Sequence, residues 1–128
     1  MELPKHVLVV EREQALRQIV CEMLVDLGYR VTIAEDAERM RAVLAADRID
    51  LIVLDATMSE REEVSLASQA KERGVRLVMI SGNPETMRLF HDRADQLLWK
   101  PFGRKELERA VNFALASETF GQRTEDPG

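Results

Sequence analysis

Three runs of four apolar residues, with a weaker fourth run, most strongly limit the folds open to this chain. The runs cover residues 7–10, 51–54, 77–80 and 97–99. None alternates polar with apolar residues, and strands that are apolar on both faces are typical of a buried parallel sheet. Residues 29–34 do alternate, which predicts a fifth strand nearer the edge of that sheet.

Helical segments fill the gaps between these strands. Apolar residues recur at helical spacing over residues 13–27, 37–46, 60–73 and 104–116, and Pro84 suits the first turn of a helix over residues 85–92. Gly28 and Gly74 follow two of these segments, where helices commonly end. The alternation predicts an α/β fold: a doubly wound, five-stranded parallel sheet with five helices on its two faces.

Size and composition exclude several classes of protein. The 128 residues suit one domain, expected over residues 1–117, followed by a polar tail over residues 118–128. A net charge of -5 gives no overall attraction to nucleic acid or to an anionic membrane. The single cysteine, Cys21, excludes a disulfide framework, and no apolar run is long enough to cross a membrane. We therefore expect a soluble, cytoplasmic protein.

Chemically useful side chains directly follow the buried runs. Glu11 follows the first, Asp55 the run at 51–54, Ser81 the run at 77–80 and Lys100 the last. The carboxyl ends of parallel strands meet at one edge of the sheet, so these side chains should converge there. A carboxylate nucleophile, a second carboxylate for Mg²⁺, a hydroxyl and an ammonium group together suit formation of an aspartyl phosphate. No glycine-rich phosphate-binding loop follows the first run.

In this order and spacing, four segments resemble the CheY-like receiver domain of two-component response regulators. The segments are HVLVVEREQALRQIVCEMLVDLGYRVTIAEDAERMRAVL, DLIVLDATM, VMISG and LLWKPF. The likeness extends from about residue 6 to residue 116 and implies a flavodoxin-like sheet with strand order 2-1-3-4-5.

By this resemblance, Asp55 accepts a phosphoryl group from the phosphohistidine of a sensor kinase or phosphotransfer protein. Ser81 and Lys100 bind that group, and the Lys100–Pro101 peptide bond is cis. The resemblance implies that Mg²⁺ is held by Glu11, Asp55 and the backbone carbonyl of Thr57. Such a domain is not an enzyme with its own product; it signals by contact with a downstream protein, and a homodimer is left open.

The resemblance also implies a partner surface on the fourth helix and fifth strand. There we expect Met87, Phe90 and Leu97 to act as apolar contacts, with Met87 and Phe90 exposed. Leu97 stands where the family usually has an aromatic switch residue, which removes the usual coupling of a ring to the hydroxyl.

Arg12 is the main departure from the family pattern, because it replaces a carboxylate that usually touches Mg²⁺. Two interpretations are open: Arg12 pairs with Asp55 in place of the metal, or it points into solvent. Ser59 replaces a usual proline and is expected to cap the following helix, with Glu62 three residues later.

Two functions follow. The first is a stand-alone receiver that is phosphorylated at Asp55, since only a short polar segment follows the last helix. The alternative is a pseudo-receiver, a binding module that works without phosphorylation. Arg12, Leu97 and the proline missing at residue 59 favour it, whereas Asp55, Ser81 and Lys100 oppose it.

Overall fold

The computed structural model describes residues 3–55 and 59–116, and these form five strands and five helices. The strands are β1 (His6–Val10), β2 (Arg30–Ala34), β3 (Leu51–Asp55), β4 (Arg76–Ser81) and β5 (Gln96–Trp99). The helices are α1 (Gln14–Asp26), α2 (Ala37–Ala46), α3 (Glu60–Glu72), α4 (Pro84–Leu89) and α5 (Arg104–Ala116). All strand pairs are parallel, and the order β2-β1-β3-β4-β5 confirms the predicted fold.

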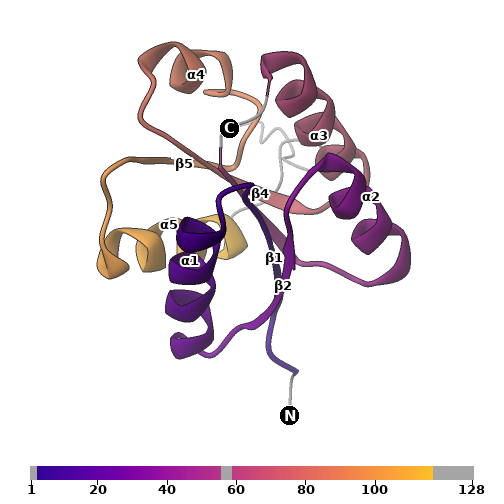
Figure 1. The fold of residues 1–128 in the computed structure, drawn as a ribbon, viewed down its shortest axis with the longest axis vertical. Coiled ribbons are helices and arrows are strands. Elements are labelled where there is room, and N and C mark those ends of the chain that lie inside the picture. The colour runs from indigo at the N-terminus through magenta and orange to yellow at the C-terminus, as the bar shows by residue number, and fades with distance from the viewer. Residues whose placement is uncertain (1–2, 56–58, 117–128) are drawn as a thin grey trace, which may run out of the picture.

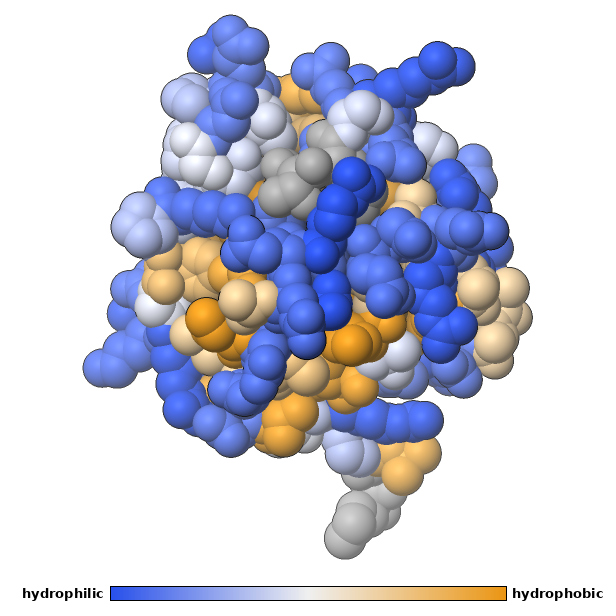
Figure 2. All heavy atoms as spheres, in the orientation of Figure 1, coloured by the Kyte–Doolittle hydropathy of each residue, from blue (hydrophilic) through white to orange (hydrophobic). Residues whose placement is uncertain are grey.

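The sheet has a hydrophobic core on each face. Alternate residues of β1 enter opposite cores: Leu8 and Val10 pack on the α2 and α3 side, whereas Val7 and Val9 pack on the α1 and α5 side. Figure 1 shows these two pairs of helices on opposite sides of the sheet. The space-filling view shows apolar residues between hydrophilic ones on the surface (Figure 2). Burial on both faces explains why the central strands are continuous apolar runs.

The ends of the helices follow from local backbone chemistry. Gly28 and Gly74 adopt φ angles of 96° and 72°, a left-handed conformation that glycine reaches without a steric penalty, after α1 and α3. The fourth helix ends at Leu89, earlier than the predicted residue 92. Beyond it, the backbone N–H groups of Arg93 and Ala94 both donate to the carbonyl of Phe90, which closes a turn and leads the chain into β5.

Ser59 caps α3, as predicted: its Oγ accepts a hydrogen bond of 3.2 Å from the backbone N–H of Glu62. We expect Ser59→Ala to lower the free energy of unfolding by about 1 kcal/mol, because it leaves an N–H at the helix start without its partner. Urea unfolding monitored by circular dichroism measures this loss. Ser68→Ala, at an exposed position inside the same helix, is the matched control. Equal midpoints for the two variants would contradict the role of Ser59.

Candidate functional site

The register of the sheet brings the four predicted site residues to neighbouring strand ends. Val10 of β1 pairs with Leu54 of β3, so Glu11 and Asp55 follow at the same level. In the same way, Ser81 of β4 pairs with Trp99 of β5, and Lys100 follows directly. The backbone N–H of Lys100 donates to the carbonyl of Ser81 over 3.0 Å. Adjacent strands therefore carry the whole set along one edge of the sheet.

Asp55 and Lys100 form an ion pair at the centre of this edge. Lys100 Nζ lies 2.9 Å from Asp55 Oδ2 and 3.1 Å from Oδ1. The carboxylate is buried, with its side chain only 5% exposed, whereas the lysine side chain is 33% exposed. The Lys100–Pro101 peptide bond is cis, as predicted. The pair places an ammonium group directly beside the carboxylate that would act as nucleophile.

Glu11 is the second buried carboxylate and is only 1% exposed. Its Oε2 accepts a hydrogen bond of 2.8 Å from the backbone N–H of Glu13, whereas its Oε1 is buried and has no hydrogen-bond partner within the part of the chain described. Burial, and then a hydrogen bond that the protonated group can share with Asp55, raise the pKa of Glu11 to about 7. The site thus contains a buried carboxylate oxygen that would favour either a proton or a cation.

Ser81 is held at the same edge by the turn that follows β4. The residue is only 4% exposed, and its Oγ accepts a hydrogen bond of 3.0 Å from the backbone N–H of Asn83. Asn83 in turn caps α4 through its side chain, which accepts from the backbone N–H of Glu85. The Ser81 hydroxyl is therefore fixed in position, and its own hydrogen is free to be donated to an anion.

Arg12 directly follows Glu11 and pairs with α3 instead of with Asp55. Its Nη2 atom lies 3.9 Å from Glu62 Oε1, and the two side chains are 57% and 36% exposed. The interpretation in which Arg12 pairs with Asp55 is wrong for this structure, because the guanidinium contacts Glu62. The alternative, a side chain in solvent, agrees with the exposure of Arg12, but the guanidinium also links the turn after β1 to α3.

Arg17 was missed by the sequence interpretation. Its Nη1 donates to the backbone carbonyl of Glu11 over 3.0 Å and makes a weaker contact of 3.4 Å with that of Arg12. These bonds fix the turn between β1 and α1, and so the backbone from which Glu11 and Arg12 project. The available signal was an arginine on the first turn of a predicted helix, close enough to reach back over the strand end.

The predicted partner surface needs correction. Met87 is 5% exposed and Phe90 is 0% exposed, so neither is an exposed contact. Phe90 belongs to the core on the α2 and α3 side, and Leu97 is partly buried against the same core. The physical reason is that α4 has only six residues, so that Met87 within it and Phe90 directly after it are both turned into the interior. Thr57, predicted as a metal ligand through its carbonyl, lies outside the described residues.

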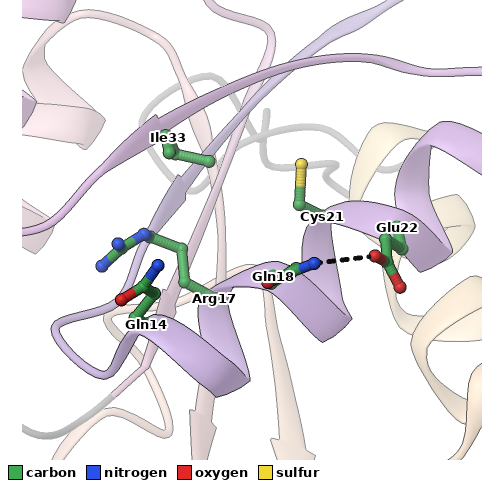
Figure 3. A pocket seen from close by; sticks show the side chains of 6 residues that line it. All are labelled: Gln14, Arg17, Gln18, Cys21, Glu22 and Ile33. Atoms are coloured by element: carbon green, nitrogen blue, oxygen red, sulfur yellow. Dashed lines mark hydrogen bonds between the residues drawn. The ribbon is translucent and has the colours of Figure 1, made fainter.

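A separate hollow of about 260 Å³ lies beside α1, outside the carboxylate cluster. It is lined by Gln14, Arg17, Gln18, Cys21, Glu22 and Ile33. In Figure 3, Gln14 and Arg17 lie at one end and Cys21 and Glu22 at the other, with a hydrogen bond between Gln18 and Glu22. Arg17 thus contributes to both the hollow and the turn that holds Glu11.

Comparisons with known proteins agree with this arrangement. The model of the response regulator receiver domain family matches residues 7–112. Regulatory protein VirG of Agrobacterium fabrum is 27% identical over 127 residues, which is 95% of this chain and 50% of VirG. Protein PetR of Rhodobacter capsulatus is 29% identical over 116 residues, or 88% of this chain and 49% of PetR. The chain thus spans about half the length of these curated relatives.

Solved structures share the fold as well. The chemotaxis protein CheY4 of Vibrio cholerae matches with a TM-score of 0.75 and 25% identity, covering 88% of this chain and 99% of CheY4. A CheY-like receiver domain from Methanospirillum hungatei matches with a TM-score of 0.78 and 23% identity, covering 88% of this chain and 94% of that domain. Among the described residues, no helix combines the length and apolar character needed to cross a membrane. With a family model that matches most of its length, this chain belongs to the response regulator receiver domain family.

Proposed function

We propose that this receiver domain accepts a phosphoryl group on Asp55 and signals through contact with a protein partner. Receiver domains are signalling modules that histidine kinases phosphorylate and that contact downstream targets. The observation that carries the proposal is the buried Asp55 carboxylate with Lys100 on both of its oxygens and Glu11 beside it. A strand end that served only as solvated surface would not bury two carboxylates.

The transfer itself needs little from the protein beyond position and charge. A carboxylate oxygen of Asp55 attacks the phosphorus of a phosphohistidine, the new P–O bond forms, and the P–N bond breaks. The imidazole leaves with the bonding electron pair and takes a proton from solvent. Lys100, which contacts Asp55, and the Ser81 hydroxyl would bind the phosphoryl oxygens and stabilise charge as it develops there.

The residues present fit a magnesium ion. Receiver domains generally bind Mg²⁺ at an acidic pocket, and magnesium proteins commonly supply only one or two carboxylates, with water and phosphate completing the shell. In this chain Glu11 and Asp55 would hold the ion, and the buried Oε1 of Glu11, which accepts no hydrogen bond from the described residues, supports that role. When bound, the ion neutralises charge on the phosphoryl oxygens and the carboxylates.

Incubation with acetyl phosphate and Mg²⁺, followed by intact-mass measurement, tests the proposal. We expect the wild-type protein to gain one phosphoryl group and Asp55→Asn to gain none, because the amide is not a nucleophile toward phosphorus. Asp92→Asn, which changes an exposed carboxylate, is the matched control and should be modified like the wild type. Modification of Asp55→Asn at the wild-type level would assign the phosphoryl group elsewhere.

The pseudo-receiver is the second candidate, and the Asp55–Lys100 pair together with Arg12 favours it. Asp55 is already neutralised by Lys100 in the resting structure, as suits a binding module that works without phosphorylation. In addition, Arg12 stands where the family usually has a carboxylate. Failure of the folded wild-type protein to accept a phosphoryl group, beside a receiver that does, would select this second function.

A further inference from the structure

The Arg12–Glu62 ion pair links the turn after β1 to the first turn of α3. Arg12 directly follows Glu11, and Glu62 lies in the first turn of α3, seven residues after Asp55. Because β1 and β3 are neighbours in the sheet, this contact joins the residue after Glu11 to α3, the helix that follows Asp55 in the chain. Arg12 is thereby one residue from Glu11, whose carboxyl group neighbours that of Asp55, where a phosphoryl group would be attached.

This bridge is weak and easily exchanged. The two charges are 3.9 Å apart, longer than a charge-assisted hydrogen bond, and both side chains are partly exposed. Exposed ion pairs of this kind contribute little to stability. In contrast, the backbone beneath Arg12 is fixed, because Arg17 holds the carbonyls of Glu11 and Arg12 and the Glu13 N–H binds Glu11. The Arg12 guanidinium can therefore change its partner while the backbone of the turn stays in place.

The charge at the site changes sharply on phosphorylation. Among the described residues of the resting site, Lys100 contacts Asp55 and Arg12 contacts Glu62. The acyl phosphate carries up to two negative charges, one more than the carboxylate it replaces, and offers three acceptor oxygens. Arginine binds phosphate oxygens through two parallel N–H donors, which a single carboxylate oxygen at 3.9 Å does not satisfy. The phosphoryl group is therefore the stronger partner.

We propose that Arg12 is a phosphoryl-binding residue, which exchanges Glu62 for the phosphoryl oxygens when Asp55 is phosphorylated. This proposal rests on the proposed function of Asp55. It gives the residue that departs from the family pattern a role of its own: Arg12 supplies positive charge to the phosphoryl group at the place where other receivers have a metal-binding carboxylate. Glu62 competes with the phosphoryl group for the guanidinium and stabilises the resting arrangement.

Beryllofluoride, a stable mimic of a phosphoryl group on aspartate, tests this exchange without catalytic turnover. Its affinity for the full chain can be measured by fluorine-19 NMR at fixed Mg²⁺. We expect Arg12→Ala to weaken binding by roughly tenfold or more, equivalent to about 1.4 kcal/mol. Arg12→Lys should recover part of the loss, because it retains the charge and lacks the paired donors. Arg41→Ala, which removes an exposed arginine of α2, should bind as the wild type does.

Glu62→Gln separates this role from a merely structural one. If Glu62 competes for Arg12, Glu62→Gln should tighten beryllofluoride binding, while Arg12→Ala weakens it. In the Arg12→Ala background, the Glu62 substitution should have no effect. If the Arg12–Glu62 ion pair only stabilised the positions of the turn after β1 and of α3, both single variants would weaken binding. That result would overturn the proposal.

The outcomes also separate this proposal from the proposed function. Equal affinity of wild type and Arg12→Ala, with Asp55→Asn unable to bind, would overturn the role of Arg12 and leave Asp55 as the acceptor. Absence of beryllofluoride binding and of phosphorylation in the folded wild type would overturn both.

Discussion

Phe90→Ala is expected to lower the free energy of unfolding by about 3–5 kcal/mol, a large part of the stability of a domain this size. The ring is 0% exposed and lies in the core formed by the sheet with α2 and α3. Its removal leaves a cavity that the surrounding helices can fill only in part, so the loss includes both the transfer of the ring from water and the cavity itself. Urea unfolding followed by circular dichroism measures the change.

Phe113→Ala provides the matched control, because Phe113 lies on α5 and is 65% exposed. Loss of a surface ring should change the free energy of unfolding by about 0.5 kcal/mol or less. Similar losses for the two variants would mean that Phe90 is not part of the core. The comparison also bears on signalling, since a Phe90 variant that fails to bind a partner would fail through unfolding and not through a lost surface contact.

The fold could be predicted from sequence because the continuous apolar runs of the central strands determined most of it. Strands such as residues 51–54 are buried on both faces, so every residue is apolar and the run stands out without an alignment. Glycines at residues 28 and 74 then marked helix ends that their left-handed φ angles confirm. The prediction of two helices, over residues 37–46 and 104–116, agrees with the structure to the residue.

The fourth helix shows where periodicity fails. With six residues, α4 makes fewer than two turns, so its apolar residues cannot be assigned to a face from spacing alone. Met87 and Phe90 were expected at the surface by resemblance, whereas both are buried, and Phe90 packs into the core on the α2 and α3 side. The burial of these two residues is determined by tertiary packing, which the local sequence pattern does not indicate.

The site, too, has one part that could be predicted from sequence and one part that could not. Sequence could bring Glu11, Asp55, Ser81 and Lys100 together because backbone topology alone places strand ends side by side. The partners of Arg12 and Arg17 depend on side-chain conformations and on the distance from the β1–α1 turn to α3, which the order of elements does not fix. Long, flexible, charged side chains are therefore the residues whose contacts required a structure.

Stability should depend on pH through Glu11. The pKa of Glu11 is raised from 4.5 to about 7, chiefly by burial. Between these values the folded protein keeps a proton on Glu11 that the unfolded chain has lost, so the free energy of unfolding falls as pH rises across that window. Each unit of pKa difference is worth about 1.4 kcal/mol, so the full loss is roughly 3 kcal/mol above pH 7.

Glu11→Gln should remove this dependence. Glutamine retains an oxygen that can accept from the Glu13 N–H and never carries the charge that burial penalises. We expect the variant to be more stable than the wild type at pH 8 without divalent metal, and the two curves to converge near pH 4.5. Urea unfolding at a series of pH values measures both curves, with Glu13→Gln as the exposed control. Parallel curves for all three proteins would contradict a buried, proton-binding Glu11. Addition of Mg²⁺ at pH 8 should stabilise the wild type and not Glu11→Gln, because a cation then takes the place that the proton holds at lower pH.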